Sequence, residues 1–400
     1  KAKKNEYQVI SIDHSMVPGY IKEGWEEFSK PLKTKTQLRK LKSHSKKFED
    51  DVWCQFYELG YRCMNFDDKF YLPFSNIDSE KKQIDVIAIN EETAFIIECK
   101  SSESFKKAPS YKDEFELLGL RIDGFKKTLQ QIYGRNLKVK YVFATRNLRL
   151  DLESEDMKRF TSTNSFYYNN NTYNYINSLL RSYKGVAFYQ FLGLVFKNDL
   201  INKDKIEIPA IKGDMGKRTY YMFSIEPSML LKLGFILHRT KVNESEFPTY
   251  QRLLVPSRLS GITKFIDDGG YFPNSIILNF CNKKHKIQFE AAAKMADSKS
   301  CFGTLKLPNC YGIAYIIDGQ HRIYGYANSK FLNSNTIPVV AFEDLDTSEQ
   351  LKIFMDINEN QKAVSPSLRL DLEEDLYWDS DRADSRIKAL RSSIIKELSN

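Results

Sequence analysis

Three charged residues lie in two neighbouring apolar segments of the chain, at a spacing that suits phosphodiester chemistry. Asp85 is part of Ile84-Asp85-Val86-Ile87, and both Glu98 and Lys100 are part of Ile96-Ile97-Glu98-Cys99-Lys100. Two carboxylates held close together repel each other and therefore favour binding a hard divalent cation, Mg²⁺ or Mn²⁺. A neighbouring lysine ammonium can polarise an attacking water and stabilise the charge of a pentavalent phosphate. The pattern predicts metal-dependent hydrolysis of a phosphodiester.

Two predicted strands would place these side chains together. Residues 84–89 and 94–99 are apolar runs, and between them lies Asn90-Glu91-Glu92, which is typical of a turn, so they predict a β-hairpin. Residues two apart on a strand share a face, and Glu98 and Lys100 therefore point the same way. The hairpin can bring Asp85, on the paired strand, beside Glu98.

A helix predicted before the hairpin supplies a third acid. Apolar residues recur at helical spacing over 48–59, and Gly60 follows as a C-cap. Glu49 lies in the first turn of this helix. It is the candidate third carboxylate of the site.

These segments resemble the PD-(D/E)xK restriction-endonuclease-like nucleases, in the branch whose first helix carries the residues that are Phe48-Glu49, Val52 and Leu59-Gly60-Tyr61 in this chain. The resemblance covers residues 46–150 and extends toward 200. It implies that Asp85 and Glu98 bind the metal, that Lys100 is the catalytic lysine and that Glu49 is an accessory acid.

The same charges also have a structural interpretation, as a salt bridge at the end of two strands. Burying two carboxylates and a lysine in apolar strands is costly without a purpose, which favours the nuclease interpretation. Gln130, Gln131 and Tyr133 end a helix expected over 111–133 and could support the site. Residues of these types more often complete an amphipathic helix.

A second group of polar residues, Asp318-Gly319-Gln320-His321-Arg322, lies between a strand predicted over 311–317 and a predicted helix. Glycine at such a turn lets the backbone approach a ligand closely, and a helix N-terminus offers free N–H groups. Arg322 adds a planar fork for phosphate oxygens, and Asp318 could orient it or hold a metal. His321 could act on a phosphate or simply pack. The chemistry indicates an anion or nucleotide pocket.

This motif resembles the DGQHR-domain proteins, which are related to the ParB/sulfiredoxin-like fold and include DndB-like regulators of DNA phosphorothioate systems. The supporting segments, in matching order, are Tyr220–Phe223, His238-Arg239, Pro256–Leu259, Gly269–Ile276 and Phe354–Lys362. The resemblance covers about 205–375. It implies nucleotide binding or hydrolysis, or contact with DNA, at Asp318, Gly319, Gln320, His321 and Arg322.

Two amides downstream, Asn358 and Gln361, are expected as partners in the same pocket, where they could read the edge of a base or a phosphate. A polar helix C-terminus followed by a turn accounts for them equally well.

The charge of the chain permits contact with nucleic acid. Lys and Arg number 60 against 52 Asp and Glu, which gives a net charge of +8. The excess is concentrated in residues 1–46, with 11 Lys or Arg against 5 Asp or Glu. This segment is either a solvated, partly disordered arm or an arm that contacts phosphates.

Several classes of protein are excluded or disfavoured. No apolar stretch is long enough for a transmembrane helix, so no membrane partner is expected. The six cysteines form no CxxC pair and indicate free thiols in a reducing cytosol, and the five histidines show no zinc-ligand spacing.

The alternation of predicted strands and helices indicates an α/β (α+β) protein of two domains. We expect a basic arm over 1–45, a nuclease-like domain over 46–200 with a mixed sheet flanked by helices, and a ParB-like α/β DGQHR domain over 205–400. Residues 161–178 are expected to be irregular, and 186–196 to complete the first domain. The last domain has no evident closing element and could continue beyond residue 400.

Together these features predict a cytoplasmic, metal-dependent DNA endonuclease. Its DGQHR domain would sense a nucleotide or modified DNA and license cutting in a prokaryotic restriction or antiphage system. An NTP is a further candidate cofactor, and a homo-oligomer is a candidate assembly. The alternatives are a DNA-binding transcriptional regulator that does not cut, and an NTPase that uses the first domain as its DNA anchor.

Overall fold

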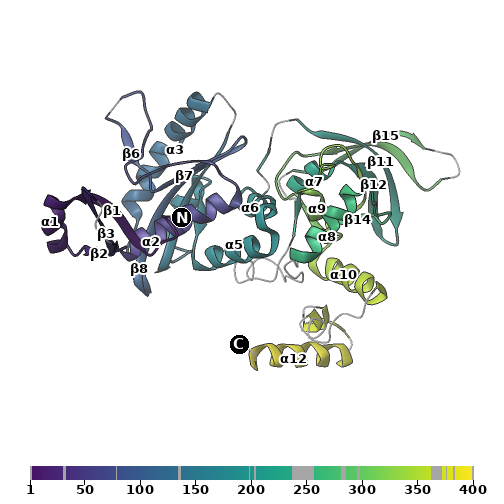
Figure 1. Cartoon of the computed structure of the whole chain (residues 1–400). Helices are drawn as coiled ribbons and strands as arrows, with labels where there is room; N and C mark the ends of the chain where they lie inside the picture. The colour runs from purple at the N-terminus through teal and green to yellow at the C-terminus, as the bar shows by residue number, and fades with distance from the viewer. Residues whose placement is uncertain are drawn as a thin grey trace. The chain divides into compact units, whose positions relative to one another are not determined.

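The computed structural model divides the chain into two compact units, unit 1 (residues 1–177) and unit 2 (178–400) (Figure 1). It describes all residues except 1, 30–32, 78, 134–136, 198, 202–203, 237–255, 281–284, 295–297, 362–371, 375, 382 and 399–400, and the side chains of 293, 294, 358–361 and 396. Each unit has its own mixed sheet and helices, so the chain is an α/β protein as expected.

Unit 1 is built on a five-stranded sheet in the order β10-β9-β8-β7-β4. The pairs β10–β9 and β9–β8 are parallel, and β8–β7 and β7–β4 are antiparallel. The strands are β4 (Cys63–Met64), β7 (Val86–Ile89), β8 (Thr93–Lys107), β9 (Lys138–Arg149) and β10 (Phe166–Tyr168). The predicted hairpin is confirmed as β7–β8, whose apolar runs are buried on both faces.

Helices cover both faces of this sheet. The helices of unit 1 are α1 (Val17–Lys22), α2 (His44–Leu59), α3 (Lys112–Tyr133), α4 (Glu155–Ser162) and the larger part of α5 (Asn170–Tyr183). The apolar positions of α3 and α4 pack into one core with side chains of β7, β8 and β9. On the other face, Phe56 of α2 packs edge-on against Phe95 of β8. Helix α2 begins at the Ser43 cap and ends at Gly60, whose φ of 114° suits glycine.

A two-stranded hairpin, β5 (Tyr71–Pro73) and β6 (Lys81–Gln83), lies against α3. The contact is close because Gly124 has no side chain, and a Cβ there would lie 1.8 Å from the carbonyl oxygen of Phe74. A larger residue at 124 would push the hairpin away from the helix. This glycine therefore fixes where β6 presents its side chains.

The described part of the N-terminal segment is not a partly disordered arm, which corrects that interpretation, whereas its contact with phosphates stays a prediction. It forms a three-stranded sheet in the order β1-β3-β2, shown in dark purple in Figure 1, together with the 3-10 turn His14–Met16 and α1. The strands are β1 (Tyr7–Asp13), β2 (Glu26–Glu27) and β3 (Lys35–Leu41). β1 and β3 pair over seven residues each, which leaves little freedom in the backbone.

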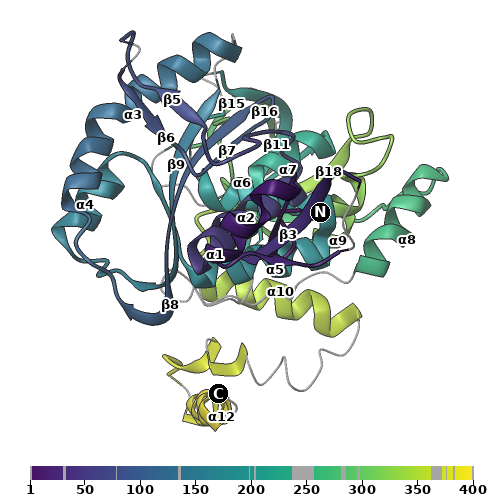
Figure 2. The same ribbon diagram turned by 60° about the vertical axis from the view of Figure 1, so that its left-hand side comes forward.

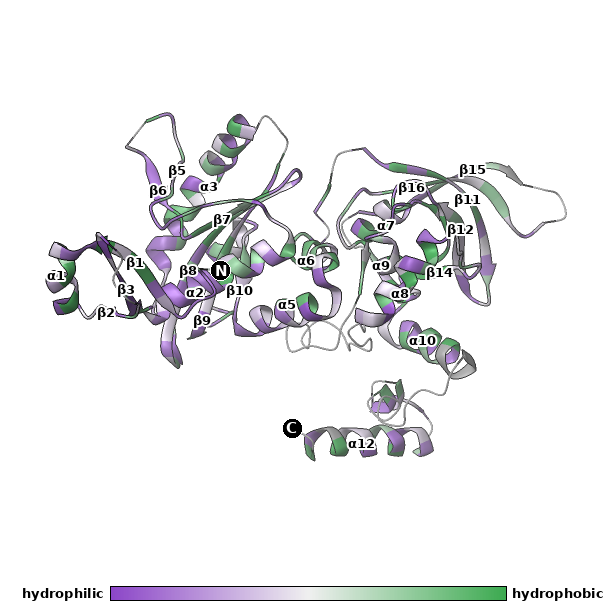
Figure 3. Ribbon diagram, viewed as in Figure 1, coloured by the Kyte–Doolittle hydropathy of each residue, from purple (hydrophilic) through white to green (hydrophobic). Residues whose placement is uncertain are grey.

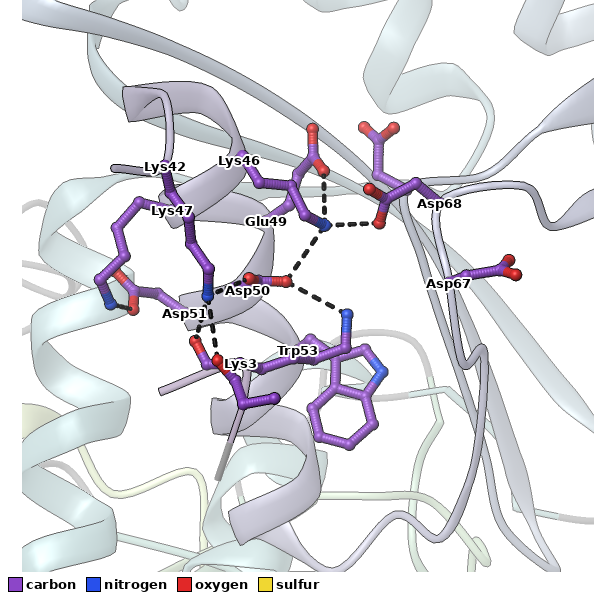
Figure 4. A network of polar contacts seen from close by, with 12 residues as sticks. Lys3, Lys42, Lys46, Lys47, Glu49, Asp50, Asp51, Trp53, Asp67 and Asp68 are labelled. Carbon is purple, nitrogen blue, oxygen red and sulfur yellow. Dashed lines mark hydrogen bonds and ion pairs between the residues drawn. The ribbon is translucent and has the colours of Figure 1, made fainter. Parts of the chain in front are cut away.

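One buried carboxylate ties this sheet to α2 (Figure 4). Asp50 is 2% exposed and forms ion pairs with Lys42 at 2.7 Å, Lys3 at 3.1 Å and Lys46 at 3.2 Å. Burial alone would raise the pKa of Asp50, but the ammonium groups outweigh it and hold the pKa below its usual value. Part of the predicted basic arm is thus neutralised inside the unit.

Unit 2 contains an eight-stranded mixed sheet in the order β13-β17-β14-β18-β12-β11-β16-β15 (Figure 2). Its strands are β11 (Ile206–Met215), β12 (Arg218–Ile225), β13 (Gly234–Phe235), β14 (Ile276–Phe280), β15 (Gln288–Lys294), β16 (Cys301–Leu307), β17 (Ala314–Asp318) and β18 (Ile337–Glu343). Its helices are α6 (Ala187–Val195), α7 (Pro227–Leu233), α8 (Pro256–Asp267), α9 (Gln320–Tyr326), α10 (Thr347–Gln361) and α12 (Ala383–Leu398), with a 3-10 turn at Lys184–Val186.

Three expectations about the middle of the chain are wrong. Residues 161–178 are not irregular but contain β10 and most of α5, because buried residues such as Tyr175 and Leu179 recur at helical spacing. The segment 186–196 does not complete the first domain. It forms α6, which contacts α7 and β13, and the boundary between the units lies at 177/178 rather than near 200.

The hydropathy of the chain follows this architecture (Figure 3). The central strands of unit 1 are mostly apolar, whereas α12 alternates apolar and polar residues along its length. No helix in the described part of the chain is long and apolar enough to cross a bilayer.

Candidate functional site

The β7–β8 hairpin carries the predicted acids. Val86 pairs with Ile97, so Asp85 and Glu98 occupy the next positions of the two strands. The backbone N–H of Cys99 donates a hydrogen bond of 2.7 Å to Asp85 Oδ2. Asp85 therefore reaches across to the strand that carries Glu98, as the sequence predicts.

A residue that the sequence did not single out holds Asp85 in position. The side-chain amide of Asn65 donates to the carbonyl oxygen of Asp85 at 3.0 Å, and its oxygen accepts from the N–H of Ile87 at 3.1 Å. Asn65 is 5% exposed. Its contacts replace backbone pairing at the point where β7 begins and fix the direction of the Asp85 side chain.

Glu98 lies between two lysines. Lys100 Nζ is 2.6 Å from Glu98 Oε1, as the pattern on one strand face predicts, and Nζ of Lys82 on β6 is 2.6 Å from Glu98 Oε2. Oε1 of Glu114, at the start of α3, lies 3.7 Å from Lys82 Nζ and 3.8 Å from Lys100 Nζ. Lys82 and Glu114 escaped the sequence analysis because a hairpin and a helix distant in sequence bring them to the site.

The carboxyl groups differ in how strongly they hold a proton. Burial would raise the pKa of Glu98, but Lys82 and Lys100 lower it overall. Burial and the charge of Glu98 raise the pKa of Asp85 to about 6. Burial and the charge of Asp85 raise the pKa of Glu49 to about 7, which places Glu49 electrostatically in the same group. Glu49 Oε2 also lies 3.6 Å from Lys46 Nζ on its own helix, and its place in one site with Asp85 and Glu98 stays a prediction.

The donor set suits a small hard cation rather than a closed metal cage. Magnesium sites commonly use one or two carboxylates and complete their coordination with water and substrate phosphates. Asp85 and Glu98 provide two such groups. Among the described residues, no three His, Cys, Asp or Glu side chains are already grouped closely enough to form a metal cage.

The residues at the end of α3 do not reach this site. Glu114 is in the first turn of α3, and Tyr133 is its last residue, about 28 Å further along the axis. The Tyr133 hydroxyl contacts Cys63 Sγ at 3.0 Å instead. Gln130 and Gln131 are exposed, in keeping with the polar face of an amphipathic helix.

The second motif forms a strand-to-helix turn, as predicted. Asp318 ends β17, Gly319 has φ of 98°, and α9 begins at Gln320. The positive φ at this position requires glycine, and a Cβ at Gly319 would also lie 2.4 Å from Cδ1 at the tip of the Ile276 side chain on β14.

Arg322 is committed to contacts within the protein. Its Nη2 lies 2.8 Å from Asp318 Oδ2 and donates to the carbonyl oxygen of Ser275 at 3.2 Å, and its Nη1 donates to the carbonyl oxygen of Asn274. The guanidinium thus joins the motif to the segment that leads into β14. Because both Nη atoms of Arg322 already have partners within the protein, the guanidinium has fewer N–H groups for a phosphate than the sequence suggested.

The other two polar residues of the second motif, His321 and Gln320, differ in their charge and in their hydrogen bonding. Burial and Arg258 lower the pKa of His321, so its imidazole is neutral at pH 7. The amide oxygen of Gln320 is buried and accepts no hydrogen bond from the described residues. The side chains of Asn358 and Gln361, and the segment His238-Arg239, lie outside what the structure describes.

We predict that Glu49→Gln stabilises the protein at pH 8 and has little effect at pH 5. The folded-state pKa values of Glu49 and Asp85 lie above their ordinary values of 4.5 and 3.8. The folded state therefore binds protons more tightly, and stability falls as pH rises from about 4 to 7. Removing the Glu49 charge should raise the free energy of unfolding at pH 8 by about 2–3 kcal/mol.

Urea unfolding of the full chain at pH 5 and pH 8 measures this effect. Glu58→Gln, an exposed position on the same helix, is the matched control and should change little. A Glu49→Gln protein that is less stable than the wild type at pH 8 would contradict the repulsion among these acids.

We predict that Arg322→Gln destabilises unit 2 by about 2–3 kcal/mol, because it removes a half-buried ion pair and leaves two carbonyl oxygens without their donor. Arg218→Gln is the control. It breaks an ion pair with Glu349, and Arg218 is 46% exposed, so the loss should stay within about 1 kcal/mol. Equal effects of the two substitutions on urea unfolding would show that Arg322 is not structural.

Comparison with known proteins finds a similarity in the second half of the chain. No curated protein and no solved structure matches the chain. Residues 208–396 match a family model described as DndB, DNA-sulfur modification-associated. This part of the chain, which contains β12 to β18 and the second motif, is therefore similar to the DndB family.

Proposed function

We propose that unit 1 is a metal-dependent DNA endonuclease whose cutting is controlled by unit 2. The observation that carries the proposal is the arrangement of Asp85, Glu98 and Lys100 on two paired strands, with Glu49 coupled to them by charge. Neighbouring acids that raise one another's pKa are stabilised by a bound cation. An ordinary structural salt bridge would need no second or third acid.

Asp85 and Glu98 would hold Mg²⁺ or Mn²⁺, which when bound polarises the phosphate and lowers the pKa of water. Each residue of the chain has a role that follows from its environment. Burial would lower the pKa of Lys100, but Glu98 raises it overall, so the ammonium stays charged and stabilises a phosphate rather than acting as a base. Glu49, with a pKa of about 7, is poised to accept a proton from the attacking water near neutral pH.

Two exposed aromatic side chains of unit 1, one next to Asn65 and one toward the far end of β8, favour DNA as the substrate. Phe66 follows the Asn65 that holds Asp85 and is 94% exposed, and Phe105 lies further along β8 from Glu98 and is 68% exposed. Phenylalanine at such positions can stack on bases. The end of β8 also carries Lys106 and Lys107, whose charges suit a phosphate backbone.

Unit 2 would sense DNA modification and license the cut. The match to a DNA-sulfur modification-associated family supports this assignment. The buried Gln320 oxygen offers an acceptor for a ligand N–H or O–H group. A nuclease unit combined with a unit that senses DNA modification would suit a prokaryotic restriction or antiphage system. Because Arg322 is bonded within the protein, an NTPase centred on this motif has less support.

A regulator that binds DNA without cutting is the second candidate. The observation that favours it is the double ion pair on Glu98, because Lys82 and Lys100 already neutralise this carboxylate. Acids compensated in this way repel DNA less strongly without a metal. In that case unit 1 would serve as a binding platform, in keeping with the family match of unit 2.

We predict that plasmid DNA is cut in the presence of Mg²⁺ or Mn²⁺, and that Glu98→Gln or Lys100→Ala lowers the rate at least 100-fold. Glu103→Gln, at an exposed position of the same strand, and Lys158→Ala, at an exposed position of α4, are the matched controls and should retain activity. Sulfur-modified and unmodified plasmids should be cut at different rates if unit 2 senses modification.

The outcome that would overturn the proposal is a folded wild-type protein that cuts neither plasmid with either metal. Salt-sensitive DNA binding under those conditions would favour the regulator. Equal loss of activity in the control variants would show that the surface charge of unit 1, rather than the site, governs cleavage.

A further inference from the structure

A cavity of about 330 Å³ lies beside Lys100, on the face of the unit 1 sheet that α3 covers. We call it the α3 cavity. Its lining contains the apolar residues Leu117, Leu118 and Phe125, the cations Lys82, Lys100 and Arg121, and also Glu114 and Tyr141. This volume falls within the range of sites that enclose small ligands. The cavity thus combines apolar surface with three cations and one acid.

The walls of the α3 cavity are fixed by packing. Gly124 lets α3 contact the backbone of Phe74, so the hairpin that carries Lys82 cannot shift toward the helix. The guanidinium of Arg121 lies 4.8 Å from the centre of the Phe74 ring. Phe125 is fully buried. A ligand would therefore enter a preformed site and lose little affinity to reorganisation.

The cations differ in how they are engaged. Lys82 and Lys100 each contact Glu98 at 2.6 Å, and Glu114 lies near both. None of the ion pairs formed by the described residues involves Arg121. Its planar fork can pair with two phosphate oxygens, and Lys82 lies on the same cavity.

We propose that the α3 cavity binds the nucleotide next to the scissile phosphate, with its phosphate on Arg121 and Lys82 and its base against Leu117 and Leu118. An inorganic anion would contact only the cations, whereas a nucleotide would contact both the cations and the apolar residues of the cavity. This inference rests on the proposed nuclease function for the position of the cut. Binding of the nucleotide itself can be measured whether or not the chain cuts DNA.

The test is calorimetric titration of the full chain with thymidine 5′-monophosphate in the absence of metal. We expect saturable binding at one site, and at least tenfold weaker binding of thymidine or inorganic phosphate alone. Oligothymidylate should displace the mononucleotide, because the proposed ligand is a nucleotide within DNA. Mononucleotide binding that the oligonucleotide does not displace would overturn this assignment.

Two pairs of variants locate the site. Arg121→Gln should weaken nucleotide binding at least tenfold, whereas Arg159→Gln, on α4 of the same unit, should not change it. Leu117→Asp places a negative charge on the cavity wall and should also weaken binding. Leu120→Asp is its control, because Leu120 lies on the same helix, is 81% exposed and does not line the cavity.

Cleavage measured in parallel separates the two claims. If the wild type cuts DNA but does not bind the nucleotide, or if Arg121→Gln and Leu117→Asp bind it normally, the α3 cavity is not a nucleotide site although the nuclease stands. If the wild type binds the nucleotide through Arg121 but cuts no DNA, the cavity assignment stands without the nuclease.

Discussion

The double ion pair on Glu98 is the interaction on which unit 1 depends. A carboxylate this deep in a sheet must be compensated, and Lys100 on the same strand supplies only one of two partners. The second, Lys82, comes from the β5–β6 hairpin, whose position is set by the contact between Gly124 and Phe74. The two lysines neutralise Glu98, whereas Asp85 and Glu49 have raised pKa values. We expect a bound cation to lower the pKa values of both acids.

The two motifs of the chain both place charged residues at the ends of strands, but the charges of the two motifs are compensated to different degrees. In unit 1, burial and the charges of neighbouring acids raise the pKa values of Asp85 and Glu49, which supports the proposed cation site. In unit 2 the Asp318–Arg322 pair is satisfied by its own charges and by backbone carbonyls, which is typical of a structural clamp. The buried Asp50 with its three lysines belongs to this second kind, and it explains why the basic N-terminal segment folds instead of remaining an arm.

Periodicity and turn chemistry were sufficient to predict the β7–β8 hairpin, α2, α3 and the strand-to-helix turn at Gly319, because each is a local pattern. The proximity of Asp85, Glu98 and Lys100 followed from the hairpin alone. Lys82, Asn65 and Glu114 could not be predicted, because elements distant in sequence bring them together. Residues 161–178 were mistaken for a loop because tyrosines fill apolar helix positions there amid Asn and Ser. The N-terminal charges gave no sign that Asp50 would bury and neutralise several of them.

The central claim is that the acids of unit 1 form a cation site, and proton release on metal binding tests it most directly. Mn²⁺ can be titrated into the full chain by calorimetry at pH 6.5 and pH 8.5, in buffers of different ionisation enthalpy. The account predicts binding that releases protons at pH 6.5 and far fewer at pH 8.5, because Glu49 and Asp85 are partly protonated only at the lower pH. Asp85→Asn should abolish this binding. No binding at either pH, or binding that Asp85→Asn leaves unchanged, would contradict it.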